Sequence, residues 1–237
     1  MKFHVMSLFP EMMEQGLSHS IIGRSQSRGL IEINNINIRD FTVNKHKRVD
    51  DAPYGGGCGM LIGAQPVYDA FASIKDGLPE GTPVVYMTPQ GRVFNQDIAK
   101  ELATHEEMVL LCGHYEGIDE RVLELICTDY LSIGDYVLTG GELPAMIVID
   151  AVSRLLPEVL HNADSFVEES FENGLLEHPQ YTRPPVFMGK EVPEVLLSGH
   201  HGKVDEYRLR EAERLTRERR PDLWEKYLKR KEEESKS

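Results

Sequence analysis

Three glycine-containing segments, each directly after a short apolar run, have residue types suited to binding a small ligand. They span residues 86–91, 112–119 and 132–144. Glycine lets backbone N–H and C=O groups approach a ligand closely because no Cβ is in the way. One such segment is more often only a tight turn, but three at the ends of neighbouring strands predict a shared pocket.

None of the three segments has the spacing of a phosphate-binding loop. The sequence contains no G-x-x-x-x-G-K-[ST] motif and no G-x-G-x-x-G after its first apolar run. A ligand without phosphates has other needs: a neutral adenine or a sulfonium group, for example, is bound by backbone hydrogen bonds and apolar walls more than by basic residues. The Gly, Ile, Tyr, Leu and Pro residues of these loops supply both, so chemistry with nucleoside triphosphates or dinucleotides loses support.

The elements that must position these segments alternate between strand and helix. Helical spacing starts at residue 65, recurs through residues 98–102 and 122–126, and returns over 141–155. Short apolar or alternating runs predict strands at residues 2–9, 30–38, 83–87, 108–112 and 130–133. This alternation predicts an α/β fold with a mostly parallel sheet, helices on both faces and ligands beyond the carboxyl ends of the strands.

The remaining segments differ in composition. Residues 44–59 are polar and glycine-rich without periodicity, which predicts a long loop that is either functional or disordered. Residues 161–178 have few apolar anchors and predict a flexible linker. Two charged helical stretches, about 203–218 and 221–233, follow. We therefore expect one domain over residues 1–160 and a small C-terminal helical domain over residues 179–237.

The net charge limits how the chain can meet a nucleic acid. Lys and Arg number 26 against 39 Asp and Glu, which gives a net charge of −13. This acidic balance argues against bulk electrostatic coating of nucleic acid. Local basic groups remain as candidate phosphate contacts, although such runs are more often solvated faces: they are residues 39–48, Arg208, Arg210, Arg214, Arg217, Arg219 and Arg220.

The cysteines and the N-terminal segment bear on the cellular compartment. Cys58, Cys112 and Cys127 have no C-x-x-C spacing and predict neither a disulfide framework nor a zinc site. The first apolar run is too short for a signal peptide, and no stretch approaches the roughly 18 apolar residues of a membrane span. We expect a cytoplasmic protein outside the membrane. The pair His200 and His201 lacks a third ligand at metal spacing, so we assign no metal residues.

Four long motifs, in the same order and spacing, resemble the bacterial tRNA (guanine-N1)-methyltransferase family TrmD of the SPOUT class. They are residues 50–60, 113–121, 132–144 and 174–184, and the resemblance covers essentially the whole chain. It implies a trefoil-knotted sheet, where topology rules alone favour an open doubly wound one. It also implies S-adenosylmethionine as the cofactor, magnesium for activity, tRNA as the substrate and a homodimer whose subunits share each active site.

The resemblance implies two sets of binding residues. Substrate contacts would come from Tyr115, Glu116, Ser170 and Glu177, with Tyr115 either stacking on a flipped guanine or only packing its loop. Glu177 stands where some relatives carry Asp, and it would read the guanine edge. The C-terminal helical domain would bind the tRNA. The cofactor pocket would be lined by Tyr86, Gly113, Ile133, Gly134, Asp135, Tyr136, Val137, Leu138, Gly140, Gly141 and Pro144.

The reaction implied by the resemblance is methylation of N1 of the guanine 3′ of the anticodon, guanine-37. N1 of a neutral guanine carries a proton, so a base must remove it as the bond to the methyl group forms. Negative charge then spreads to O6, where the guanidinium of Arg154 would stabilise it. Without the resemblance, Arg154 would be interpreted as covering an exposed helix face with its aliphatic stem.

The base is where the sequence departs from the family pattern. Relatives usually carry Asp-Ser-Phe before Gly-Leu-Leu, whereas this chain has Glu169 at the Asp position. The extra methylene moves the carboxylate by more than about 1 Å, which can cost on the order of a hundredfold in rate unless the backbone compensates. Asp164 is the alternative base. Two other functions stay open: a knotted RNA-binding protein with reduced or no turnover, and a methyltransferase of ribosomal RNA.

Overall fold

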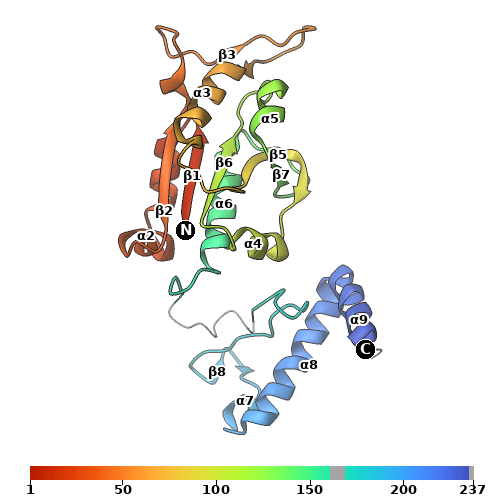
Figure 1. Cartoon of the computed structure of the whole chain (residues 1–237). Coiled ribbons are helices and arrows are strands. Elements are labelled where there is room, and N and C mark those ends of the chain that lie inside the picture. Colours follow the sequence, from red (N-terminus) through yellow and green to blue (C-terminus); the bar gives the residue numbers. More distant parts are fainter. Residues whose placement is uncertain (161–168, 235–237) are drawn as a thin grey trace. The chain divides into compact units, whose positions relative to one another are not determined.

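The computed structural model describes residues 1–160 and 169–234, and the chain forms two compact units, Met1–His161 and Asn162–Ser237 (Figure 1). The first unit is built on a five-stranded sheet in which every neighbouring pair is parallel, with the order β2-β1-β6-β5-β7. The α/β class with a parallel sheet, predicted from the alternation of strands and helices, is confirmed. The strands are β1 (Lys2–Ser7), β2 (Glu32–Asn37), β5 (Val84–Val93), β6 (Glu107–Cys112) and β7 (Asp129–Ser132).

Two apolar layers enclose the sheet because its central strands bury side chains on both faces. In β6, Met108 and Leu110 belong to one buried cluster, and Val109 and Leu111 belong to the other. Strands buried on both sides read as continuous apolar runs, which is why this segment was predictable. The first cluster packs under α1 (Pro10–Leu17), α2 (Ser20–Ser27), α4 (Gln96–Leu102) and α6 (Glu142–Ser153), and the second packs under α3 (Ala64–Lys75), α5 (Glu120–Ile126) and the 3-10 helix η1 (Ile38–Phe41).

The helices α1 and α2 were not expected, since only a turn was predicted after the first strand. Pro10 occupies the start of α1, where its fixed φ and missing N–H fit a helix N-terminus. Each helix has only eight residues and contains one glycine, Gly16 or Gly23, so the helical period is short and weak. The predicted loop 44–59 also contains structure, because β3 (Asp50–Asp51) pairs with β4 (Leu61–Ile62).

Strand β5 leaves and re-enters the ladder with β7, and this detour forms part of the site. Met87 and Arg92 both pair with Leu131, so residues 88–91 bulge out between them. Arg92 closes the bulge through Asp129 at 2.7 Å and Glu101 at 2.9 Å. The strand prediction ended at Met87 because proline and glycine follow it, whereas the strand resumes and continues to Val93.

In its described residues the second unit contains a short hairpin, three helices and a small core. Leu175, Ala212 and Tyr227 form this core, with Trp224 packed against it. The Leu176 N–H donates to Thr216 Oγ1 at 2.8 Å, so residues 169–178, the second half of the predicted linker, fold against α8. No helix among the described residues is long and apolar enough to cross a membrane. The elements are β8 (Val186–Phe187), β9 (Lys190–Glu191), α7 (Glu194–Leu197), α8 (His201–Arg219) and α9 (Pro221–Glu234).

Candidate functional site

A cavity of about 600 Å³ lies at the carboxyl ends of β6 and β7 and beside the bulge of β5. This is the edge at which ligands bind in parallel α/β sheets. Among the residues implied by the resemblance, Tyr115 and Glu116 line the cavity, while Asp135 is not among its lining residues. The other lining residues of that set are Tyr86, Gly113, Ile133, Gly134, Tyr136, Val137, Leu138, Gly140, Gly141 and Pro144.

The walls of the cavity meet through backbone contacts that leave no room for side chains. The Gly141 N–H donates to the Gly113 carbonyl at 2.9 Å, which joins the loop after β6 to the loop after β7. A Cβ at Gly141 would lie 2.7 Å from Cys112 Cα, and a Cβ at Gly113 would lie 2.8 Å from Tyr86 Oη. Backbone contact therefore requires glycine at position 141, and at position 113 a larger residue would have to displace the hydroxyl end of Tyr86.

The bulge 88–91 supplies a third wall, which lies in the predicted ligand loop 86–91 although none of its residues was named as a site residue. Thr88, Pro89 and Gln90 line the cavity beside Tyr86. A Cβ at Gly91 would overlap the backbone of Tyr130 and Leu131, so the chain can pass there only as glycine. The segment 86–91 was recognised as a ligand loop, but its individual residues carry no charge or motif that would have identified them.

Tyr86 lies at the floor of the cavity and is 8% exposed. Burial raises the pKa of its phenol to about 12, and nearby Cys127, Glu120 and Tyr130 contribute in the same direction. The Tyr86 ring also meets the Tyr130 ring edge to face, with centroids 5.9 Å apart. Tyr86 is therefore a neutral hydroxyl on an apolar ring at physiological pH.

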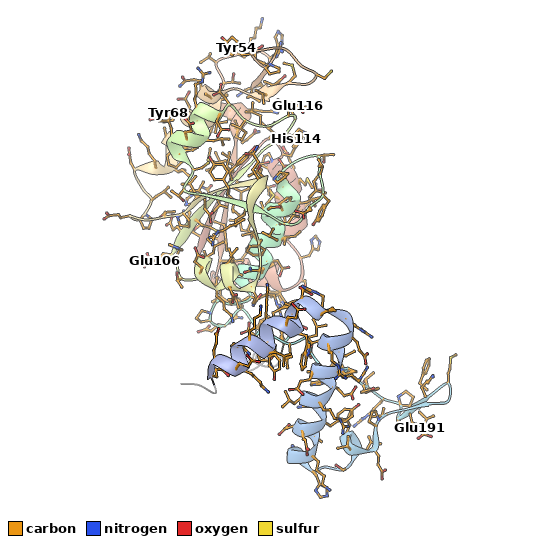
Figure 2. All side chains as sticks on the ribbon, turned by 90° about the vertical axis from the view of Figure 1, so that its right-hand side faces the viewer. Tyr54, Tyr68, Glu106, His114, Glu116 and Glu191 are labelled. Carbon is orange, nitrogen blue, oxygen red and sulfur yellow. The ribbon has the colours of Figure 1, made fainter. Side chains whose placement is uncertain are left out.

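Tyr115 and Glu116 connect the cavity to two other motifs of the sequence. The Tyr115 hydroxyl accepts from Arg39 at 3.3 Å, and Arg39 begins the basic run 39–48. The Glu116 N–H donates to the Met60 carbonyl at 3.0 Å, which attaches the glycine-rich loop to the cavity rim. Figure 2 shows Glu116 on the same side of the unit as the loop that carries the fully exposed Tyr54. Tyr115 is 44% exposed and has φ near +60°, so its ring is held but still accessible.

Behind the glycine wall lies a buried polar group that the sequence did not reveal. Ser7 Oγ donates to Glu142 Oε1 at 2.7 Å, and the Phe9 N–H donates to Ser7 Oγ at 2.8 Å. His114 lines the cavity, packs edge to face against Phe9 with centroids 5.0 Å apart, and has a buried Nδ1 without a hydrogen-bond partner in the described structure. Ser7, His114 and Glu142 are far apart in sequence, so no spacing rule brings them together.

The candidate catalytic residues belong to different units. Arg154 is the C-cap residue of α6 in the first unit, and its N–H donates to the Asp150 carbonyl at 3.1 Å. Glu169, with Ser170 and Glu177, belongs to the second unit. Asp164, the alternative base, lies outside the described residues.

Within the second unit, Ser170 and Glu177 are in direct contact. Ser170 Oγ accepts from the Glu177 N–H at 2.9 Å, and Glu177 Oε1 accepts from Gln180 Nε2 at 2.6 Å. Two of the substrate residues implied by the resemblance are therefore joined by a hydrogen bond that closes the loop between them. In the described part of the chain, no group of three or more His, Cys, Asp or Glu side chains is arranged to hold a metal ion.

Comparisons with known proteins agree on one group of relatives. The sequence model of the family described as tRNA (Guanine-1)-methyltransferase TrmD matches residues 1–226. A tRNA (guanine-N(1)-)-methyltransferase of Ruminiclostridium cellulolyticum is 55% identical over 95% of this chain and 97% of the relative. Enzymes of the same name from Clostridioides difficile and Lachnospira eligens are 56% and 53% identical, over 95% and 99% of this chain and 98% and 99% of the relatives.

Proposed function

Because the chain belongs to the tRNA (guanine-1)-methyltransferase TrmD family, we propose that both of its units serve one reaction, the transfer of a methyl group from S-adenosylmethionine to N1 of the guanine 3′ of the anticodon. The chain is a tRNA methyltransferase of the SPOUT class by its family. The observation that carries the assignment of the site is the cavity at the sheet edge, built from loops of this family's motifs.

The residues of the cavity suit S-adenosylmethionine. Among the described residues that line it there is no Lys or Arg, so it does not favour a polyphosphate. Its glycine walls expose backbone groups that can pair with an adenine edge, and Tyr86, Ile133, Leu138 and Pro144 provide apolar contact. When bound, the cofactor supplies a methyl group on positively charged sulfur, which makes that carbon open to attack.

Glu169 is the proposed general base and Arg154 the proposed stabiliser of negative charge on O6. A carboxylate suits the first role because the proton on N1 must leave as the nucleophile forms. A guanidinium suits the second because it presents fixed positive charge to the developing oxyanion. Glu177 carries its own carboxylate on the turn capped by Ser170, and we assign it to the N1–H and amino edge of guanine.

A homodimer with a shared active site is part of the proposal. Exposed apolar side chains lie on the neighbouring helices α1 and α6, where Met12 is 39% exposed and Leu143 and Ile147 are 45% exposed. A second copy of the chain would cover them and would bring its own second unit. Sedimentation of the purified protein tests the dimer directly.

The proposal also includes the trefoil knot, a magnesium requirement, a cytoplasmic location and tRNA binding by residues 179–237.

Transfer of a labelled methyl group from S-adenosylmethionine to unmodified tRNA tests the reaction. The tRNA should carry G after the anticodon, and a transcript with A at that position is the control. We expect transfer only to the first. No transfer to either RNA by folded protein would overturn the proposal, and transfer to ribosomal RNA instead would redirect it.

The same assay separates the enzyme from a binding protein that has lost turnover. The wild type is compared with Glu169→Asp, which restores the residue usual in relatives. Activity in both proteins supports the enzyme over the binding protein. Activity in the variant alone would mean that Glu169 prevents turnover in this chain.

A further inference from the structure

Glu142 is the only buried carboxylate among the described residues, with 3% of its surface exposed. Acidic side chains are almost never fully buried unless they are paired. Its partner here is the neutral hydroxyl of Ser7, which donates to Oε1 at 2.7 Å. Within residues 1–160 and 169–234 it forms no ion pair with a Lys or Arg.

A buried negative charge without a cation is costly, so something else must offset it. Glu142 is the first residue of α6, and the positive end of the helix dipole supplies part of the compensation. The carboxylate also acts on Cys112: burial and the negative charge of Glu142 together raise the pKa of the Cys112 thiol well above its usual value. A cation held nearby would complete the compensation.

The carboxylate lies directly behind the cavity wall. Gly140 lines the cavity, and a Cβ there would overlap Glu142 Oε2 and would lie 2.6 Å from His114 Nδ1. Only a glycine backbone therefore separates the Glu142 carboxylate from the ligand space. His114 Nδ1, on the same side, has no hydrogen-bond partner in the described structure.

We propose that Glu142 is a specificity-determining residue that favours a cationic ligand, so that the cavity holds the sulfonium of the methyl donor better than the neutral thioether of the product. The inference rests on the proposed function. In the reaction, the carbon–sulfur bond breaks, sulfur keeps the electron pair and becomes neutral, and N1 of guanine gains the methyl group and loses its proton. The attraction of Glu142 for the ligand disappears with the charge, which weakens binding of the product.

The test compares affinities for S-adenosylmethionine and S-adenosylhomocysteine by calorimetry, because the two ligands differ only in the methyl group and the positive charge. Glu142→Gln keeps the size of the side chain, and its amide oxygen can still accept from Ser7. We expect the ratio of the two affinities to shift about tenfold against the cation, the order expected for losing one charge–charge attraction at an effective dielectric of about 20. S-adenosylhomocysteine affinity should change little.

Glu120→Gln is the matched control, since Glu120 lines the same cavity but is exposed to water. We expect a smaller shift of the ratio, because water screens an exposed charge. Kinetics distinguish an electrostatic role of Glu142 from a structural one. Glu142→Gln should raise KM for the methyl donor without lowering kcat. A merely structural Glu142 would weaken both ligands equally, and that outcome overturns the inference, as does a Glu120→Gln shift of equal size.

If Glu142→Gln does not fold, the salt dependence of ligand binding to the wild-type protein still tests the inference. The affinity ratio measured at about 0.05 M and 0.5 M salt should stay constant, since a buried charge is screened little. A ratio that moves strongly with salt would assign the preference to the exposed Glu116 and Glu120 instead. Wild-type protein that binds neither ligand would contradict the proposed function, whereas binding of both with an unchanged ratio in Glu142→Gln would contradict only this inference.

Discussion

The cavity at the sheet edge and the segment 169–178 are assembled by different kinds of contact. The cavity walls are backbone packed on backbone, as where the Gly141 N–H meets the Gly113 carbonyl at 2.9 Å. The segment 169–178 is held by side chains that cap turns, as where Ser170 accepts from the Glu177 N–H and Asn173 accepts from the Leu175 N–H. Phe171, in the middle of this segment, is 46% exposed.

This difference predicts where the protein can absorb sequence change. A wall with no space for a Cβ cannot move without disturbing the sheet behind it, because packed interiors transmit strain. A segment at the surface that is held by side-chain caps can shift its backbone at smaller cost than a packed wall. The proposed base lies in the second region, which is consistent with Glu169 replacing the aspartate of relatives.

Glu169→Gln should produce the largest effect and should separate the two regions most clearly. We expect kcat to fall by roughly 10²–10⁴-fold, the usual contribution of a general base. Calorimetry should show unchanged affinity for S-adenosylmethionine, since the cavity is formed by the first unit. Equal turnover in the variant and the wild type would remove Glu169 from the mechanism and direct attention to Asp164.

Gly91→Ala tests the cavity walls, where backbone packs on backbone. The added Cβ overlaps the backbone of Tyr130 and Leu131, so β5 and β7 must separate. We expect the free energy of unfolding to fall by about 3 kcal/mol and donor affinity to fall with it, measured by chemical denaturation and calorimetry. Gly77→Ala is the control, because its Cβ would meet only the Ile74 carbonyl at an ordinary 3.6 Å. Similar losses in both variants would mean that close packing at Gly91 is not the cause.

Tyr86 gives the cavity region a pH-dependent stability. Its pKa is raised to about 12 in the folded protein by burial, against an ordinary value near 10. The folded state therefore gains stability that is complete below pH 10 and is lost as the pH rises toward 12, by roughly 2 kcal/mol. Denaturation curves for the wild type and Tyr86→Phe should diverge between pH 10 and 12, and parallel curves would contradict the assignment.

Ser170→Ala should have the smallest effect and tests the capped turn. It removes the 2.9 Å hydrogen bond from the Glu177 N–H to Ser170 Oγ, which is worth about 1 kcal/mol. We expect kcat/KM for tRNA to fall roughly fivefold while donor affinity stays the same. Ser198→Ala, which removes a bond to the Val195 carbonyl in the same unit, is the control and should leave kcat/KM unchanged.

The sequence predicted the parallel sheet well because each strand lies in a short apolar or alternating run bounded by polar or turn residues. It missed α1 and α2, whose eight-residue length leaves little period to detect. It ended β5 at Met87, since proline and glycine normally end a strand, and here they form a bulge instead. Local patterns describe local structure, and the bulge exists only because β7 lies beside it.

In the candidate site, too, the residues with a local signal were predictable and those brought together only by the fold were not. Loop residues such as Gly113 and Gly141 were named because glycine marks close approach, and they line the cavity. Glu142 and Ser7 were not named, because 135 positions separate them and only the fold places their side chains 2.7 Å apart. The roles of Glu169 and Glu177 stay predictions, to be tested by the variants above.

The bulge in β5 has a consequence for how such a cavity can change over time. Met87 and Arg92 both pair with Leu131, so the residues between them add nothing to the register of the sheet. Gly91 is fixed by its contact with the backbone of Tyr130 and Leu131, but insertion or deletion at residues 88–90 would resize the cavity while every strand kept its neighbours. The length of the bulge can therefore change during evolution, and the ligand preference of the cavity with it, while the strand order of the sheet stays the same.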